Sequence, residues 1–216
     1  MKSKRILLEV ADKTSSGILL LPDPAKKVGV VLAHGAGGNM HSHFISYFHE
    51  QIARAGYPCL KFNFLYSEAR RKVPDPQSVL VSCYEKAMEV VPAKQLVIGG
   101  KSMGGRIASY LAERGGVAGL FFLGYPLHAP GKTNQLRDQH LFAIHKPMFF
   151  ASGTKDPFAR FDLLTNLVQQ IGTFASTFFV EQGGHSFEVP KKSGRGKEEI
   201  NRFVAESLIS WLDSTF

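Results

Sequence analysis

The sequence has few of the features that mark disulfide-bonded or membrane-embedded proteins. Its 216 residues include only two cysteines, and no apolar run approaches the roughly 20 residues that cross a bilayer. Cys59 and Cys83 lie within apolar patterns, which indicates small core residues rather than a disulfide framework. The basic start is followed by an apolar run that is broken at Glu9, too short for a signal peptide. We therefore expect a cytoplasmic protein without a membrane partner.

Acidic residues are also scarce, with 18 Asp and Glu against 26 Lys and Arg, giving a net charge of +8. Nucleic-acid-binding proteins often show such a surplus. Here, however, the basic residues fall in small scattered groups, and no aromatic-basic RNA-binding signature accompanies them. We expect the charge to serve mainly solubility and expect no nucleic-acid partner. The sequence leaves the oligomeric state open.

Apolar segments of two kinds alternate along the chain. Short buried runs predict strands at 6–10, 17–21, 28–33, 57–64, 96–98, 117–124, 148–152 and 176–181. Helical spacing predicts helices at 44–55, 79–91, 135–144, 161–169 and 200–212, and a further helix after the strand at 96–98. This alternation indicates an α/β fold, a mostly parallel sheet with helices on both faces. No linker interrupts it, so we expect a single domain over 1–216, and the short segment 125–147 leaves little or no room for a cap domain.

The segment that joins the strand at 96–98 to the following helix contains a G-x-S-x-G pattern, Gly100–Gly104, centred on Ser102. This pattern lets a serine occupy a sharp strand-to-helix turn with its hydroxyl projecting from the sheet. The flanking glycines avoid a Cβ clash in that turn. A phosphate-binding loop is rejected because Gln95 stands where that motif needs a glycine. The pattern alone leaves open a serine that only caps the helix.

Three residue types needed for nucleophilic catalysis each follow the carboxyl end of a predicted strand. They are Ser102, Asp156 and His185, and in a parallel sheet such positions share one edge. A serine hydroxyl needs an imidazole to take its proton, and the imidazole needs a carboxylate to fix its tautomer. Asp156 has a structural alternative as a turn or helix cap, and His185 as a surface loop residue. Their joint placement, in the chain order of α/β hydrolases, predicts a catalytic triad.

Two backbone amides are expected to hold the oxyanion of the reaction. One belongs to Met103, directly after the nucleophile, and the other to Ala36, in the loop after the strand at 28–33. Gly35 and Gly37 let the backbone of this loop approach a substrate closely. His34 is expected to tie the loop down rather than to transfer protons.

Further residues are candidates to line a substrate pocket: Phe44, Tyr66, Leu127 and Phe158. Arg70 and Arg71 are open between two interpretations, attraction of an acidic substrate and simple exposure to solvent. His41 and His43 have no Cys or carboxylate partner at metal-ligand spacing. We therefore expect neither a metal nor another cofactor.

Several motifs together resemble the dienelactone-hydrolase-like branch of the α/β hydrolases. More closely, they resemble the group containing testis-expressed protein 30 and subunit 3 of the NSL histone-acetyltransferase complex. The segments that carry this resemblance are 34–38, 62–76, 100–106, 124–128, 153–158 and 184–187. The resemblance implies an α/β-hydrolase fold and Ser102, Asp156 and His185 as triad, and it implies no particular substrate. Dienelactone hydrolases typically use a cysteine nucleophile, so the resemblance does not extend to that activity.

The sequence therefore predicts a serine hydrolase that cleaves a small carboxylic ester or thioester through an acyl-enzyme. Two alternatives stay open at this point. One is a noncatalytic interaction module that keeps the hydrolase fold, and the other is an acyltransferase that uses an acceptor other than water.

Overall fold

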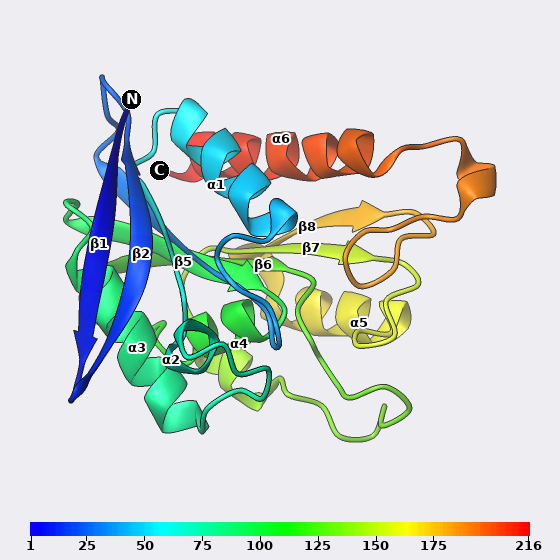
Figure 1. Ribbon diagram of the computed structural model, residues 1–216. Coiled ribbons are helices and arrows are strands. Elements are labelled where there is room, and N and C mark those ends of the chain that lie inside the picture. The colour runs from blue at the N-terminus through cyan, green and yellow to red at the C-terminus, as the bar shows by residue number, and fades with distance from the viewer. The chain divides into compact units, whose positions relative to one another are not determined.

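Eight strands form the sheet of the protein (Figure 1). The computed structural model describes residues 1–216, which pack as two compact units, Met1–Leu120 and Phe121–Phe216. The strands are β1 (Lys2–Val10), β2 (Lys13–Leu21), β3 (Val28–Ala33), β4 (Cys59–Phe62), β5 (Gln95–Lys101), β6 (Val117–Leu123), β7 (Met148–Gly153) and β8 (Ala175–Val180). Their order in the sheet is β1-β2-β4-β3-β5-β6-β7-β8. The β1–β2 and β2–β4 pairs are antiparallel, whereas β3–β4, β3–β5 and β7–β8 are parallel, which confirms the predicted mostly parallel α/β sheet.

In the first unit, helices cover both faces of the strands (Figure 1). Its helices are α1 (His43–Arg54), α2 (Leu65–Glu68), α3 (Gln77–Glu89) and α4 (Met103–Ser109). Helix α1 contacts β3 and β4 on one face, and α3 and α4 pack together on the other. Every residue of β3 is buried, which explains why this strand has lost the polar alternation of a half-exposed strand. The hydroxyl of Tyr84, on α3, lies 2.7 Å from the carbonyl oxygen of Gly99 and accepts from the amide of the same residue, which anchors α3 to β5.

In the second unit, α5 (Phe161–Ile171) and α6 (Lys197–Thr215) lie on opposite sides of β7 and β8 (Figure 1). Helix α6 contacts both strands. Its buried residues recur at helical spacing, and the ring of Trp211 lies 5.6 Å from that of Phe149 on β7. Three short 3₁₀ helices complete the chain: η1 (Gln139–Ala143), η2 (Gly172–Phe174) and η3 (Lys191–Ser193).

The structure differs from the sequence prediction mainly where apolar periodicity is weak. Strand β1 begins at Lys2 rather than at residue 6, because its exposed polar half pairs with β2 through the backbone. The segment after β4 lies outside the predicted helices, yet it contains the four-residue helix α2, which is too short to show a helical period. No helix is long and apolar enough to span a bilayer. The cytoplasmic location stays a prediction.

The turn between β5 and α4 packs unusually closely against the end of β3. A Cβ atom added to Gly104 would lie 2.7 Å from the carbonyl oxygens of Ala33 and His34, and one added to Gly100 would overlap the oxygen of Ala33. Backbone oxygens cannot move aside as a flexible side chain can. Glycine at both positions is therefore a condition for bringing β3 and the turn together.

We predict that Gly104→Ala destabilises the protein by about 3 kcal/mol, because the added methyl group collides with two backbone oxygens. The matched control is Gly115→Ala, where an added Cβ meets no atom within 4 Å, and its effect should stay within about 1 kcal/mol. Urea denaturation of the two variants measures the difference. Equal stabilities would contradict the close approach of this turn to β3.

Helix α1 carries a buried histidine next to a buried lysine. The Nε2–H group of His49 donates to the carbonyl oxygen of Cys59 on β4 at 2.9 Å. Burial, and then the positive charge of Lys61, lower the pKa of His49 from 6.5 to about 4. Lys61 itself donates to the hydroxyl of Ser46 at 2.8 Å, and burial lowers its pKa. The folded state therefore holds His49 neutral where the unfolded chain would protonate it.

This difference between the folded and unfolded pKa of His49 predicts that the protein loses stability as the pH falls. Between the unfolded pKa of 6.5 and the folded pKa of about 4, the unfolded state binds the extra proton, so stability rises with pH across that window. Acidification from about pH 7 to about pH 5 should cost roughly 2 kcal/mol through this residue alone. His49→Gln, which keeps a hydrogen-bond donor, should lose that share of the pH dependence in urea titrations. An unchanged pH dependence in the variant would show that His49 does not carry it.

Candidate active site

Ser102 occupies a strained turn between β5 and α4. Its backbone angles are φ 50° and ψ −116°, a region that residues with a Cβ rarely adopt. Such a conformation costs on the order of 1–3 kcal/mol and persists only where the surrounding structure imposes it. Here the close packing of Gly100 and Gly104 against β3 imposes it. The side chain is partly exposed, so the strained serine lies at the surface of the first unit.

The loop after β3 lies directly beside this serine. A Cβ atom added to Gly35 would lie 3.4 Å from the Cβ of Ser102 and 3.4 Å from the carbonyl oxygen of Lys101. The next residue, Ala36, is exposed, and Gly37 has a positive φ of 68°. Loop and serine are thus neighbours within the first unit, and the oxyanion-binding role of Ala36 and Met103 stays a prediction.

His34 fastens this loop as a neutral ring. Its Nδ1–H donates to the carbonyl oxygen of Gly35 at 2.9 Å, and its Nε2 accepts the amide of Phe64 at 3.2 Å. Burial lowers the pKa of His34 from 6.5 to about 4, although the bond to Gly35 acts in the opposite direction. Because Nε2 is an acceptor here, only the neutral tautomer fits both bonds. This confirms the expectation that His34 ties down the loop.

The segment that follows β4 holds the same loop through three side chains. Asn63 Oδ1 accepts the amide of Met40 at 2.8 Å, and Ser67 Oγ donates to the carbonyl oxygen of Gly38 at 2.9 Å. The hydroxyl of Tyr66 lies 3.2 Å from the carbonyl oxygen of Gly35. These bonds were not predicted from the sequence, because they join residues more than 20 positions apart.

The carboxylate of Glu68 orients one of these three side chains, that of Asn63. Glu68 Oε2 accepts from the side-chain amide of Asn63 at 2.9 Å and from the hydroxyl of Ser16 at 2.7 Å. Burial acts to raise the pKa of Glu68, but the bonds from Asn63 and Ser16 outweigh it and the pKa lies below its ordinary value. An ionised Glu68 accepts both hydrogens, which fixes Asn63 with its oxygen toward Met40.

In the second unit, Asp156 and His185 form a hydrogen-bonded pair. Nδ1 of His185 donates to Oδ2 of Asp156 at 2.8 Å, while the other oxygen of Asp156 accepts the amide of Phe158 at 2.8 Å. The Asp156 side chain is fully buried and that of His185 is 18% exposed. The ring of Phe158 lies 4.4 Å from the imidazole and restricts its orientation. With Nδ1 as donor, Nε2 is the nitrogen that can accept a proton.

Hydrogen bonds join the loop that carries Asp156 to the loop that carries His185. The amide of Lys155 donates to the carbonyl oxygen of Gly183 at 2.9 Å, and the amide of Gln182 donates to the hydroxyl of Thr154 at 2.8 Å. A Cβ atom on Gly153 would overlap the backbone of Gly183. Contacts between backbones therefore set the separation of Asp156 and His185.

A second histidine fastens a loop in the way that His34 does. His128, buried, donates from Nδ1 to the carbonyl oxygen of Ala129 at 2.9 Å and accepts the amide of Arg160 on Nε2 at 3.0 Å. It ties the segment after β6 to the loop of Asp156. Sequence reasoning missed this role, although a histidine shortly after the end of a strand, a position that His34 also holds, was the available signal.

The other candidate residues occupy different environments. Tyr66 and Leu127 are fully buried, so they support the loops that surround them. Phe44 is half-buried, with its ring centre 5.8 Å from Nζ of Lys101, the residue that precedes Ser102. Arg70 is exposed and has a positive φ of 56°. The substrate-binding roles of all these residues stay predictions.

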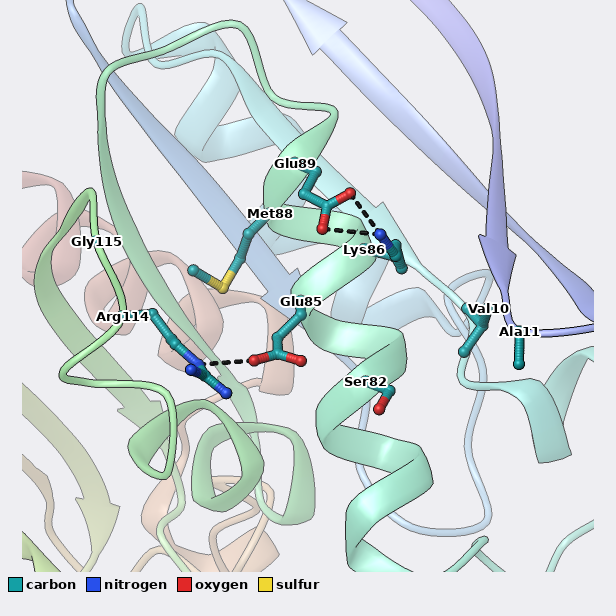
Figure 2. Close-up of a pocket in the computed structure, with 9 residues that line it drawn as sticks. All are labelled: Val10, Ala11, Ser82, Glu85, Lys86, Met88, Glu89, Arg114 and Gly115. Carbon is teal, nitrogen blue, oxygen red and sulfur yellow. Dashed lines mark hydrogen bonds and ion pairs between the residues drawn. The ribbon is translucent and has the colours of Figure 1, made fainter.

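The first unit also contains a hollow of about 580 Å³ (Figure 2). It is lined by α3, by the turn after β1 and by Arg114 and Gly115, and Arg114 is paired with Glu85 at 2.7 Å. The amide of Leu96, near the start of β5, donates to Gly116. The hollow therefore adjoins the amino end of β5, whereas Ser102 follows the carboxyl end, and its charged groups already pair with each other. We do not place the chemistry there.

Solved structures with similar folds are known from several bacteria. A dienelactone hydrolase from Anabaena variabilis superposes with a TM-score of 0.76 at 20% identity, covering 100% of this chain and 98% of that one. An α/β serine hydrolase homologue from Coxiella burnetii gives 0.75 at 17% identity, covering 96% and 98%. A serine hydrolase without lid from Xanthomonas campestris gives 0.75 at 15% identity, covering 97% and 95%. At these identities the likeness shows the fold.

The sequence itself matches the family described as alpha/beta hydrolase domain over residues 26–213. The match includes Ser102, Asp156 and His185 and continues across both compact units. Together with the sheet order and the strained serine between β5 and α4, it shows that the chain belongs to the alpha/beta hydrolase domain family.

Proposed function

We propose that the protein is a serine hydrolase that cleaves a small carboxylic ester or thioester. The observation that carries the proposal is the strained backbone of Ser102, with φ 50°. A serine that only capped a helix would need no such conformation, whereas a nucleophile presented at a sharp turn does. The hydrogen-bonded pair of Asp156 and His185, each just beyond a strand end, supplies the base and the carboxylate that orients it.

In the proposed reaction, Oγ of Ser102 attacks the carbonyl carbon of the substrate while Nε2 of His185 takes the hydroxyl proton. The amides of Met103 and Ala36 stabilise the oxyanion that forms. The carbon–oxygen or carbon–sulfur bond then breaks, and His185 returns the proton to the leaving alcohol or thiol. Water next attacks the acyl-enzyme with His185 as base, which releases the carboxylic acid and restores Ser102.

The role of Asp156 follows from its hydrogen bonds. Its Oδ2 accepts from His185 and its Oδ1 from the amide of Phe158, so the carboxylate cannot rotate without breaking a bond. It therefore holds the imidazole in the tautomer with Nε2 as proton acceptor and stabilises the imidazolium during the reaction. The mechanism uses only groups that the chain supplies.

The proposed triad takes Ser102 from the first compact unit and Asp156 with His185 from the second. We propose accordingly that residues 1–216 act as one hydrolase domain, which the family match across both units supports. Between β6 and β7 the only regular element is the short η1. Such a connection offers no cap to enclose a long acyl chain, which favours small or exposed acyl groups.

The sequence resembles more closely the group of testis-expressed protein 30 and subunit 3 of the NSL complex. That resemblance is compatible with the alternative of a noncatalytic interaction module. The intact serine, acid and histidine favour catalysis in this chain over a noncatalytic module. An acyltransferase would use the same residues, and it would reveal itself by a product that depends on an added acceptor. Dienelactone hydrolysis is the activity named for the Anabaena protein, and we do not propose it for this one, whose elbow carries serine.

We predict that a fluorophosphonate probe labels the protein at Ser102 and that Ser102→Ala abolishes labelling. Such a probe reacts with a serine whose proton is taken by a neighbouring base. The matched control is Ser210→Ala, which removes an exposed hydroxyl on α6 and should label as the unchanged protein does. Gel fluorescence and intact-mass measurement provide the readout. Folded protein that resists the probe would support the noncatalytic alternative and refute the proposal.

A further inference from the structure

Strand β1 forms one end of the sheet, and its outer edge has no strand beside it (Figure 1). All nine of its residues pair with β2 in one unbroken register, so the strand contains no bulge. It contains no proline either. The result is a straight free edge about 30 Å long, which presents unpaired backbone N–H and C=O groups to any chain able to pair with it.

The side chains along this edge are arranged symmetrically about one apolar residue. Leu7 is 66% exposed, and Arg5 and Glu9, which share its face of the strand, are exposed as well. On the opposite face, Leu8 and Val10 are buried and Ile6 is half-buried, and helix α3 packs against the strand. Along this exposed face of β1, the side chains are therefore a cation, Arg5, then Leu7, then an anion, Glu9.

We propose that β1 pairs antiparallel with β1 of a second copy of this chain, with the two-fold axis at Leu7. In that register Leu7 faces the partner's Leu7, and Arg5 faces the partner's Glu9. The two-fold symmetry adds a second ion pair, between Glu9 and the partner's Arg5. Residues directly opposite each other in an antiparallel pair lie on the same face with their Cβ atoms about 5 Å apart. On the buried face, Ile6 meets the partner's Leu8, which continues the apolar surface across the junction.

The charged side chains of β1 favour this antiparallel register over a parallel one. A parallel, in-register pair would place Arg5 against Arg5 and Lys4 against Lys4, and like charges directly opposite each other destabilise a sheet. Charged residues usually protect a free edge from pairing. In β1 the basic residues stand before Leu7 and Glu9 after it, so the edge is complementary to itself in the antiparallel direction alone. A two-fold pair uses each edge once and closes, which stops further addition of strands.

The interface leaves the proposed catalytic residues of the first unit uncovered. Strands β2 and β4 separate β1 from β3, which leads into the loop of Ala36. The proposed dimer therefore does not depend on the proposed function, and it is tested by measuring association of the chains rather than activity.

Cysteine cross-linking tests the register directly. Leu7→Cys places two thiols on the axis, within the Cα separation of about 4.4–6.8 Å that a disulfide needs, whereas Ser3→Cys places them eight residues, or about 27 Å, apart. Both positions are exposed, and the native cysteines Cys59 and Cys83 are buried. Under mild oxidation we expect a covalent dimer from Leu7→Cys and monomer from Ser3→Cys. Equal cross-linking of both variants would overturn the antiparallel register.

Charge exchange provides the second measurement, by sedimentation velocity over a range of protein concentrations. Arg5→Glu and Glu9→Arg should each weaken dimerisation about tenfold or more, because each replaces two attractive pairs by two repulsive ones. The double variant Arg5→Glu/Glu9→Arg should restore it. Circular dichroism checks that each variant is folded. A wild-type protein that stays monomeric throughout, or a dimer indifferent to the single exchanges, would overturn the proposal.

Discussion

The close approach of two backbones is the constraint on which the site depends. Glycine at 100 and 104 lets the turn after β5 come against the carbonyl oxygens at the end of β3. That approach holds Ser102 in its strained conformation and places the loop of Gly35 beside it. One packing contact thus positions both the proposed nucleophile and the proposed oxyanion donors. The strain is offset by the packing of a fully buried strand, β3.

Within each unit, buried histidines and hydrogen-bonded carboxylates fix the loops that carry the candidate residues. His34 and His128 use the same pair of bonds, donating to the carbonyl oxygen of the next residue and accepting an amide from another loop. Asp156 accepts from His185 and from the amide of Phe158, and Glu68 accepts from the side chains of Asn63 and Ser16. His185 differs from the other two histidines, because its Nδ1 bonds to a carboxylate side chain and its ring is partly exposed. These contrasts support the proposal that His185 transfers protons, whereas His34 and His128 hold loops in place.

Local sequence predicted the parts of the molecule that are governed by local rules. The buried runs of β3 and β5, the glycines around Ser102 and the strand ends before Asp156 and His185 all leave a signature within a few residues. The hydrogen bonds of Asn63, Tyr66 and Ser67 to the loop after β3 leave none, because they join distant segments. Helix α2 is too short to show a period, and the first half of β1 is polar, so its pairing with β2 was invisible in the apolar pattern. The sequence could place reactive residues at strand ends, but the bonds that orient them emerge only in three dimensions.

The central claim is that Ser102 and His185 act as one catalytic unit. A double-mutant cycle of ester hydrolysis tests it most directly, with kcat measured for Ser102→Ala, His185→Ala and the double variant. Residues that act as a unit are strongly non-additive. We expect each single variant to lose about as much activity as the double variant. Losses that multiply, or a His185→Ala protein that keeps full activity, would contradict the account.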